Sequence, residues 1–401
     1  MSILDRKRIV LGVTGGVAAY KAADLASRLV QAGAIVDVVM SSAATNFIGA
    51  ATFEALTKHP VHLSVFEHWT ETDFGHVSLA RNADIVILAP ATANSIAKYA
   101  HGLADDMLGA VLLSTTAPVL AAPAMEHQMF HHPATQSNIA TLLARGVTFV
   151  GPARGRLASG AVGDGRLAPV DVLVGAARFL LGGSGFLRGT RLVVSAGGTQ
   201  EALDPVRIIG NRSSGRMGYA LAQAGIDAGA SVTLVSAPTA LEPPYGVNCI
   251  RVVSADEMRS AISAACEFAD VLIMAAAVAD FRPRSAAITK IKKSASSDDL
   301  KLDLVRNPDI LAGISGHRLV KIGFAAETEN LLANAASKLQ AKGLDMIVAN
   351  DAVSTIDSPD SHAHILVRGG DVESLPPMSK VDLAGVILAK LPDLLVRTRH
   401  E

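Results

Sequence analysis

One local pattern, an apolar strand followed by two glycines, a helix and a second strand, occurs twice in this 401-residue chain. The first copy opens with the apolar stretch 8–14 and Gly15-Gly16, and the second opens with 191–196 and Gly197-Gly198. Strands that alternate with helices form right-handed βαβ units around a parallel sheet. We therefore expect an α/β protein made of two doubly wound, Rossmann-like domains.

After its two glycines, each copy is expected to continue with a helix and a second strand. In each half a further apolar strand starts with Ala-Asp. Between the halves, Gly182-Gly-Ser-Gly185 is typical of a flexible linker. We place the boundary near Gly189, so the domains are expected to cover residues 1–189 and 190–401. The remaining elements are predicted at 17–31, 35–40 and 83–90 in the first half and at 216–228, 231–235 and 269–276 in the second.

The composition agrees with this fold class and excludes several functions. Half of the residues are apolar, 18% are charged and only 4% are aromatic, as in parallel sheets whose aliphatic strands are buried on both faces. No apolar run reaches the roughly 18–20 residues of a spanning helix, and the charged start 1–8 predicts no secretory signal. The net charge of −1 favours neither a nucleic-acid nor a membrane partner. The two cysteines lack metal-ligand spacing. A cytoplasmic protein is expected.

In the first half, the residues after two strands are candidates for ligand binding. Gly12 to Gly16 precede a helix, whose free N–H groups attract anions, although such glycines also form ordinary turns. The loop 90–95 either caps the next helix or holds a ligand. His76 lies in a polar stretch where a structural and a catalytic role are both open. Neither half has the G-x-G-x-x-G fingerprint with its acidic partner, which argues against a nicotinamide dehydrogenase.

Taken together, Gly12–Lys21, Gly75-His76, Pro90–Ser95 and Pro123-Ala-Met125 resemble the phosphopantothenoylcysteine decarboxylase branch of the flavin-dependent cysteine decarboxylases. The resemblance implies a flavodoxin-like domain over residues 1–189 that binds FMN, with His76 as catalytic residue and Met125 at the substrate. It implies that the flavin takes electrons from the substrate thiol, so that CO2 can leave, and later returns them. The implied FMN-binding residues are Gly12, Thr14, Gly15, Gly16, Ser41, Pro90, Ala91, Thr92, Ala93, Asn94 and Ser95.

Two positions depart from that family. Its Pro-x-Met-Asn-x-x-Met motif has Glu126 in place of the asparagine that holds the substrate carboxylate. In the expected flap 154–166, Ser159 stands where the family has a catalytic cysteine. Serine is a far weaker acid than cysteine, so it is a poor direct substitute as a proton donor. We expect retained decarboxylation with another donor; the alternative is a flavin-binding module that regulates or organises oligomers without decarboxylating.

In the second half, the segment 204–218 concentrates cationic and hydroxyl groups ahead of a helix. It contains Arg207, Asn211 and two serines, which suits an anionic, phosphorylated substrate better than a simple helix cap. Asp280 ends a strand, where a carboxylate can hold a metal ion or a nucleotide hydroxyl. Lys338 and Lys342 are one helical turn apart and could meet phosphates together. The basic stretch 290–293 with 294–299 is either a solvated loop or a lid.

These motifs, in this order over nearly all of residues 190–400, resemble the phosphopantothenate–cysteine ligase family. The resemblance implies a CTP-dependent ligase that condenses phosphopantothenate with cysteine through an acyl-cytidylate, with Mg²⁺ on the triphosphate. Asn211 would hold the acyl-cytidylate beside Arg207, and Lys290 would assist the attack by cysteine. The residues by themselves do not separate CTP from ATP. The residues expected around the nucleotide are Ala275, Asp280 (also the metal candidate), Asn307, Pro308, Asp309, Ile310, Leu311, Phe324, Lys338 and Lys342.

The sequence thus predicts a two-enzyme fusion of coenzyme A biosynthesis. A ligase joined to a non-decarboxylating flavin module is the alternative, and Glu126 and Ser159 keep it open. The resemblance also implies a homo-oligomer, in which trimeric flavoprotein units are joined by ligase dimers.

Overall fold

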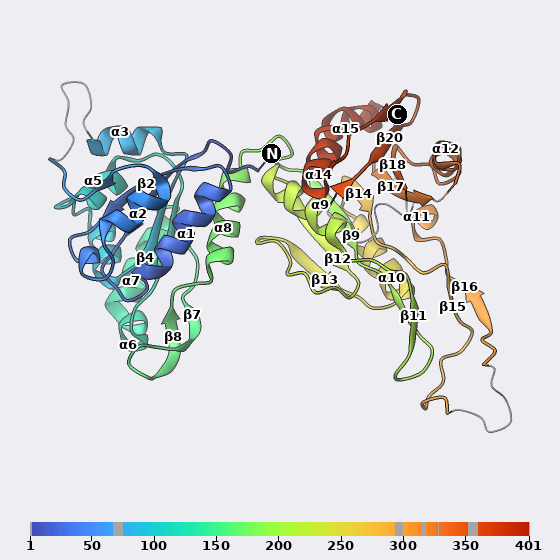
Figure 1. The fold of residues 1–401 in the computed structure, drawn as a ribbon, viewed down its shortest axis with the longest axis horizontal. Coiled ribbons are helices and arrows are strands. Elements are labelled where there is room, and N and C mark those ends of the chain that lie inside the picture. Colours follow the sequence, from blue (N-terminus) through green and yellow to red (C-terminus); the bar gives the residue numbers. More distant parts are fainter. Residues whose placement is uncertain are drawn as a thin grey trace. The chain divides into compact units, whose positions relative to one another are not determined.

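The computed structural model describes residues 2–66, 75–292, 300–314, 318–327, 329–351 and 360–400. The chain divides into two compact units, Ser2–Gly182 and Gly183–Glu401 (Figure 1). The division follows the last helix of the first unit and falls in the glycine-rich stretch 182–185. Each unit is described by itself.

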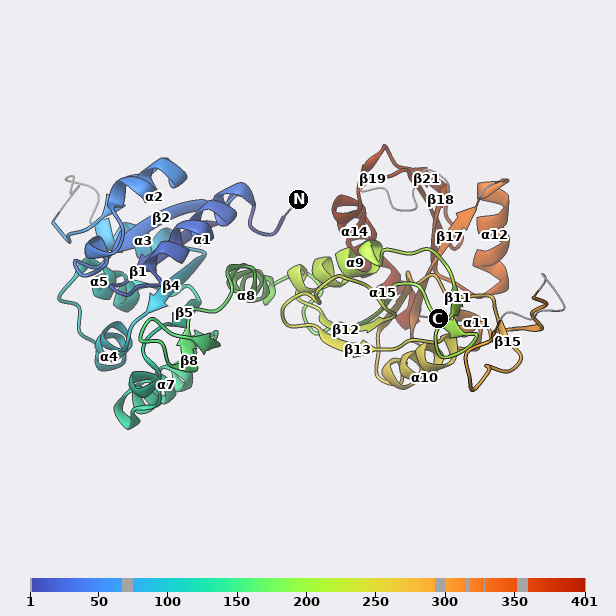
Figure 2. The same cartoon turned by 60° about the horizontal axis from the view of Figure 1, so that its bottom comes forward.

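The first unit is a six-stranded parallel sheet in the order β3-β2-β1-β4-β5-β6, the Rossmann order. Figure 2 labels its central strands β2, β1, β4 and β5. The predicted doubly wound α/β fold is confirmed, but the label flavodoxin-like does not describe this strand order, because flavodoxins have the order 2-1-3-4-5. The strands are β1 (Arg8–Val13), β2 (Ile35–Met40), β3 (Val61–His62), β4 (Ile85–Ala91), β5 (Val119–Pro123) and β6 (Thr148–Phe149).

Helices cover both faces of this sheet. One face carries α3, α4, α5 and α7 in a shared apolar core, and on the other α1 packs with α2 and α8. An antiparallel hairpin, β7 (Ala153–Arg156) and β8 (Val162–Arg166), lies outside the sheet at the predicted flap. The helices are α1 (Ala19–Gln31), α2 (Ala50–Thr57), α3 (Gly75–Asn82), α4 (Ala93–His101), α5 (Met107–Ser114), α6 (His127–His131), α7 (Pro133–Ala144) and α8 (Val170–Gly182).

The second unit repeats the plan in an eight-stranded sheet, β13-β12-β9-β14-β17-β18-β20-β21. Its first six strands are parallel, and β20 and β21 extend it antiparallel. The strands are β9 (Arg191–Ala196), β12 (Ser231–Ser236), β13 (Asn248–Arg251), β14 (Val271–Met274), β17 (Val320–Glu327), β18 (Met346–Asp351), β20 (Ala363–Val367) and β21 (Val372–Ser374).

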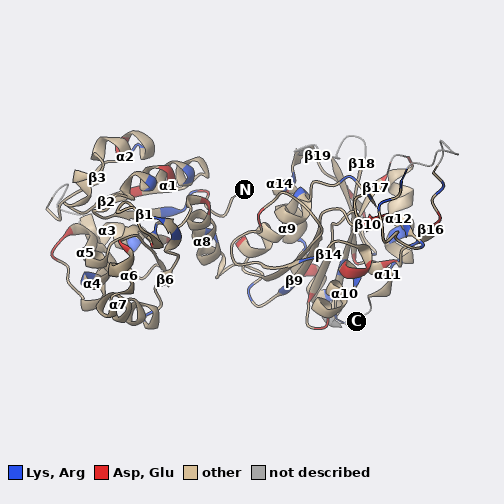
Figure 3. Cartoon of the chain, turned by 90° about the horizontal axis from the view of Figure 1, so that it is seen from below, with Lys and Arg blue, Asp and Glu red and all other residues tan. Residues whose placement is uncertain are grey.

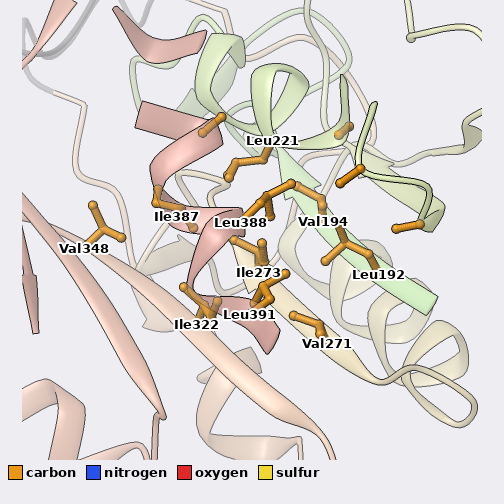
Figure 4. Packing of buried hydrophobic residues seen from close by; sticks show 14 of the residues in the cluster. Leu192, Val194, Leu221, Val271, Ile273, Ile322, Val348, Ile387, Leu388 and Leu391 are labelled. Atoms are coloured by element: carbon orange, nitrogen blue, oxygen red, sulfur yellow. The ribbon is translucent and has the colours of Figure 1, made fainter. Parts of the chain in front are cut away.

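Apolar side chains fix the helices of the second unit on the two faces of its sheet. Leu221 of α9 and Leu388 of α14 point toward Val194 and Ile273 of the central strands (Figure 4). The other face packs against α10, α11 and α12. The helices are α9 (Arg216–Asp227), α10 (Ala255–Cys266), α11 (Ile310–Gly313), α12 (Leu331–Ala341), α14 (Lys380–Ala389) and α15 (Leu391–His400).

Short two-stranded ribbons complete the second unit. They pair β10 (Gln200–Ala202) with β11 (Ile208–Gly210), β15 (Phe281–Pro283) with β16 (Leu304–Arg306), and β19 (Asp360–Ser361) with β22 (Met378–Ser379).

The Ala-Asp repeat has a structural role that is the same in both units. Asp84 accepts the backbone N–H of Arg8 at 2.8 Å, and Asp270 accepts that of Arg191 at 2.8 Å. Each aspartate also pairs with a cationic side chain, Lys7 or Arg191 itself. Each carboxylate therefore ties the start of one strand, β1 or β9, to the start of its neighbour in the sheet, β4 or β14.

Lys and Arg residues and Asp and Glu residues occur in both units (Figure 3), in keeping with the net charge of −1. Within the described residues, the structure has no helix of the length and apolar character needed to cross a bilayer.

Candidate active sites

In both units the direction in which successive strands are added to the sheet reverses between two neighbouring strands. These neighbours are β1 and β4 in the first unit and β9 and β14 in the second. Ligands of open α/β sheets bind at such points, beyond the carboxyl ends of the strands. A cavity of about 960 Å³ lies there in the first unit, and one of about 690 Å³ in the second. We call them the first and the second cavity.

The first cavity is built on the beginning of helix α1. Residues 14–18 line it, and within the described chain no side chain caps α1, whose N-cap is Ala18. Gly15 permits this turn, because a Cβ there would lie 2.4 Å from the Cβ of Ala43. In this first turn Ala19 and Lys21 donate their N–H groups to Gly16 O at 2.9 Å and to Ala18 O at 3.0 Å. The helix dipole at this end still favours an anionic ligand.

The loop 90–95 caps a helix, and four of its residues also line the cavity. Thr92 is the N-cap of α4 and accepts the N–H of Ser95 at 3.3 Å. The buried Thr14 hydroxyl donates to Pro90 O at 2.6 Å and accepts Thr92 N–H at 3.2 Å. These bonds join the two loops at the ends of β1 and β4. Thr92, Ala93, Asn94 and Ser95 line the cavity, whereas Pro90, Ala91 and Gly12 are not among its lining residues.

Two buried polar atoms have no hydrogen-bond partner among the described residues, Ser41 Oγ and His76 Nδ1. An unpaired buried polar atom carries a desolvation cost that a ligand can remove. Ser41 lines the first cavity, so its hydroxyl is placed to meet a bound molecule. His76, near the start of α3, is half-buried and is not among the residues that line the cavity of its own chain.

The hairpin β7–β8 closes one side of the first cavity at the predicted flap. Met125 donates its N–H to Gly165 O at 3.0 Å, and both residues line the cavity together with Glu126. Ser159 lies in the exposed hairpin turn and does not line the cavity, although its neighbour Ala158 does. The sequence therefore located the flap, and the structure places Ser159 at its tip.

Some lining residues of the first cavity carried no motif signal. Lys98 pairs with Asp105 and Asp106 at 2.7 and 3.1 Å, and these partners raise the pKa of its ammonium group. Tyr20 and Phe47 are large and exposed beside the cavity. Tyr20 belongs to the motif Gly12–Lys21, whereas Phe47 and Lys98 lie outside every motif identified in the sequence.

The second cavity is built on the beginning of α9, which likewise lacks a side-chain cap within the described chain. Its N-cap Gly215 has φ +74°, a left-handed conformation that favours glycine. Ser213, Ser214 and Arg216 line the cavity here, with Arg212 beside them. Uncapped N–H groups and two guanidinium groups thus converge where the segment 204–218 was predicted to bind an anion.

The opposite wall of the second cavity is the chain 275–280. The predicted strand 269–276 ends early, at Met274, because Ala276 N–H bonds to Ser195 Oγ at 3.1 Å instead of continuing the sheet. Asn211 Nδ2 donates to Val278 O at 3.0 Å, and Asn307 Nδ2 donates to Ala279 O at 2.8 Å. Two predicted site residues therefore hold this wall and line the cavity at the same time.

The segment that carries Lys290 is attached to the ribbon β10–β11 through Asp204. The buried Asp204 carboxylate accepts Ile291 N–H at 3.1 Å, while Arg207 Nη1 donates to Ile291 O at 3.0 Å and to Asp204 at 2.9 Å. Burial alone would raise the pKa of Asp204, but the N–H groups of Val206, Ile291 and Arg207 hold that pKa below its usual value. Both backbone polar groups of the residue after Lys290 are thereby fixed.

The two lysines predicted to act together have different partners. Lys342 lines the second cavity and pairs with Asp309 at 2.8 Å. Burial of Asp309 would raise the pKa of that carboxyl, but its bond to Lys342 keeps the pKa low. Lys338 pairs with Glu327 and is not among the lining residues.

Arg207 and the exposed Lys290 also stand outside the lining of the second cavity, and residues 293–299 of the suggested lid lie outside the described residues. The lining includes Asn350 of β18 and two polar residues that the sequence did not indicate, Arg306 and Lys380. Lys380 begins α14, which lies far along the chain from any motif. The predicted residues that do line it are Asn211, Ala275, Asp280, Asn307, Pro308, Asp309, Ile310, Leu311, Phe324 and Lys342.

Comparisons with known proteins cover both units. The sequence model of the family described as Flavoprotein matches residues 2–179. The model described as DNA/pantothenate metabolism flavoprotein C-terminal domain matches residues 187–394. A crystal structure of the C-terminal domain of a coenzyme A biosynthesis bifunctional protein CoaBC is 38% identical, with a TM-score of 0.46, over 52% of this chain and 97% of that one.

Curated relatives match along the whole length. The coenzyme A biosynthesis bifunctional protein CoaBC of Vibrio cholerae is 46% identical over 395 residues, which is 97% of this chain and 98% of the relative. The protein of the same description from Escherichia coli is 41% identical over 392 residues, 96% of each chain. The chain is therefore an enzyme that belongs to the family of bifunctional coenzyme A biosynthesis proteins, flavoproteins that unite phosphopantothenate–cysteine ligase and phosphopantothenoylcysteine decarboxylase.

Proposed function

We propose that the second cavity binds phosphopantothenate and CTP and joins the acid to cysteine. The observation that carries this assignment is the uncapped start of α9 with Arg212 and Arg216, which faces the wall 275–280. The carboxylate oxygen attacks the α-phosphorus of CTP and pyrophosphate leaves. The cysteine amine then attacks the acyl carbon, CMP leaves, and the amide forms with loss of a proton.

The described residues divide this task among them. The N–H groups of α9 and Arg212 suit the phosphate of phosphopantothenate. Asn211 lies between that phosphate site and the wall 275–280, where the acyl-cytidylate carbonyl would sit. Lys342 would meet the triphosphate after exchanging its bond to Asp309 for one to phosphate. Asp280 is exposed at the cavity and is the carboxylate proposed to share Mg²⁺ with the triphosphate.

Lys290 is proposed to assist the second half of the ligation. Its side chain is exposed, and Asp204 and Arg207 fix its segment at Ile291. A lysine near the acyl carbon would stabilise the oxygen charge that develops as cysteine attacks. This role predicts a larger effect of Lys290 on amide formation than on pyrophosphate release.

The first cavity is proposed to hold FMN. The uncapped N–H groups of α1 suit the phosphate of FMN, and the unpaired Ser41 hydroxyl offers a partner to the same ligand. When bound, FMN supplies the two-electron oxidation and reduction that make loss of CO2 from phosphopantothenoylcysteine possible. The chain itself binds and orients the substrate between that cofactor and the hairpin β7–β8.

His76 is proposed to act in the cavity of a neighbouring subunit. It is absent from the lining of its own cavity, and its Nδ1 is buried without a partner among the described residues. A homo-oligomer with flavin sites shared between subunits would supply the missing contact. The trimer, its assembly through ligase dimers and the cytoplasmic location remain predictions.

Glu126 and Ser159 bear on how decarboxylation ends. Glu126 lines the first cavity, where it would repel a substrate carboxylate unless protonated or turned away, and the neighbouring His127 is not among the lining residues. Ser159 lies at the hairpin tip and would protonate the product poorly. We propose that decarboxylation proceeds and that a donor other than Ser159 completes it.

One reaction separates the proposed steps. Full-length protein with its flavin is incubated with phosphopantothenate, cysteine, Mg²⁺ and either CTP or ATP. We expect pyrophosphate and the cysteine adduct with CTP first, followed by CO2 and phosphopantetheine. Absence of pyrophosphate with both nucleotides would overturn the ligase assignment. An adduct that accumulates without CO2 would favour the non-decarboxylating flavin module.

A further inference from the structure

Three potential metal ligands converge beside the first cavity, on helix α6 and strand β8 (Figure 1). His127 and His131 are one helical turn apart, with ring centroids 4.4 Å from each other. Asp164 Oδ2 lies 3.2 Å from His131 Nε2. One ligand atom from each of the three residues lies within 4.8 Å of the others.

Glycines on β8 make this convergence possible. A Cβ at Gly163 would lie 2.6 Å from His127 Nδ1, and a Cβ at Gly165 would lie 2.2 Å from Met125 O. The strand can therefore lie directly against residues 125–127, where Met125 N–H bonds to Gly165 O at 3.0 Å. Asp164, between the two glycines, is brought to the histidines by backbone contacts that do not depend on its own side chain.

The surroundings of His127 suit a metal ligand. Its Nδ1 lies 3.1 Å from Asp164 N and 3.3 Å from Asp164 O, so the ring can accept from the first or donate to the second. In the tautomer that donates from Nδ1, the other ring nitrogen has a free lone pair. Metal-bound histidines commonly use this pairing, in which a backbone carbonyl fixes the ring.

We propose that His127, His131 and Asp164 bind one divalent transition-metal ion of the zinc class. Two imidazoles and one carboxylate form a common three-residue donor set for zinc, with a fourth position left to water. Ligand atoms about 2.0–2.2 Å from one ion lie a little over 3 Å apart, close to the 3.2 Å between His131 and Asp164. Calcium or magnesium would instead require more oxygen ligands.

A bound ion would join two parts of the wall of the first cavity. Helix α6 follows Glu126 directly, and β8 contributes Gly165 and Arg166 to the lining. Helix α6 and strand β8 thus connect Glu126, in the motif expected at the substrate, with the hairpin β7–β8 that closes one side of the cavity. The ion would therefore hold the hairpin in its closed position. Metal binding is measured separately from catalysis, so its outcome does not depend on the proposed reactions.

The test uses full-length protein with its flavin, freed of metal by a chelator and dialysed. Zn²⁺ is titrated by calorimetry into wild type, His131→Gln, Asp164→Asn and the control His101→Gln, which removes an exposed histidine at the end of α4. We expect one ion per wild-type chain. Affinity should fall at least about tenfold in the two site variants and should stay unchanged in the control.

A second readout follows the hairpin. Zn²⁺ should slow tryptic cleavage at the hairpin arginines Arg154, Arg156 and Arg166 in wild type, but not in His131→Gln or Asp164→Asn. Flavin absorbance and the midpoint of thermal unfolding show that the variants are folded. Equal Zn²⁺ affinity in all four proteins, or no binding to wild type, would overturn the proposal and leave an ordinary His–Asp surface pair.

Discussion

Helices α1 and α9 occupy the same place in the two units, after the first strand of each sheet, and both begin without a side-chain cap in the described chain. Around α1 the first cavity is lined by the hydroxyl residues Thr14 and Ser41 and by Lys21 of the first helical turn. Around α9 the second cavity is lined by Arg212 and Arg216. The same kind of helix start is thus combined with different cationic side chains.

That difference fits the two kinds of ligand. The larger volume of about 960 Å³ suits a cofactor that has one phosphate and a broad aromatic ring. Two guanidinium groups in a smaller cavity suit small molecules with several negative charges. The predictions below test whether each unit depends on its own helix start, beginning with the largest expected effect.

The first prediction disrupts the packing of one unit at a time by replacing a glycine with valine. In Gly218→Val the added Cβ would lie 2.5 Å from Ala196 Cβ and 2.7 Å from Ser195 O, so α9 must move. Such overpacking costs about 1–3 kcal/mol or more, and pyrophosphate release should be abolished while flavin absorbance stays. Gly15→Val, which meets Ala43 at 2.4 Å, should do the reverse. Loss of both functions in either variant would contradict independent units.

The second prediction concerns the hairpin of the first unit. Ser159→Cys should raise phosphopantetheine formation on the order of 100-fold, because a thiol is a much better proton donor than a hydroxyl. Pyrophosphate release should not change. Ala161→Cys is the matched control, with the same thiol two residues away in the same turn. A rate equal to wild type would mean that the existing donor does not limit the reaction.

The third prediction concerns Asp204, which holds the segment of Lys290. Lys290→Gln should slow amide formation on the order of 100-fold, and Asp204→Asn should slow the same step about tenfold through misplacement. Pyrophosphate release should change less in both. Since the pKa of Asp204 is lowered, the carboxylate is charged above its ordinary pKa and loses these bonds only as pH falls through the lowered value. The defect of Asp204→Asn should therefore be constant between about pH 5 and pH 8.

The fourth prediction compares two lysines on one helix. Lys342→Ala should raise the KM for CTP about tenfold, because Lys342 lines the second cavity and can contribute a charge-assisted bond to phosphate. Lys338→Ala should change it less than about twofold, because Lys338 pairs with Glu327 outside the lining. Equal effects would show that ligand binding moves Lys338 into the cavity.

Much of the fold followed from local sequence. The strands at 191–196 and 35–40 were predicted at their observed bounds, because short aliphatic runs near a glycine leave little choice of structure. The strand predicted to end at Ala276 stops at Met274. That end is set by bonds to Ser195 and Gly197, more than 75 residues earlier, which no local pattern contains.

The residues of the candidate sites also divide into those predicted from local sequence and those that only the tertiary structure revealed. Thr14, directly after a predicted strand, lines a cavity, since its place follows from the strand itself. Asp280 was predicted to end a strand, but β14 stops at Met274 and Asp280 lines the cavity from the chain beyond it. Lys380 was missed, because it belongs to a helix whose position depends on the packing of α14 against α9. His76 and Lys338 carried motif or spacing signals, yet they lie outside the cavities of this chain.

The sequence by itself determined two Rossmann-like units, their glycine turns and the families they resemble, because these depend on periodicity and short motifs. Only the tertiary structure decided which of those residues share a cavity, that Asp204 fixes the segment of Lys290, and that His127, His131 and Asp164 meet. These relations join residues far apart in the chain. They depend on how strands and hairpins pack, which no short stretch of sequence contains.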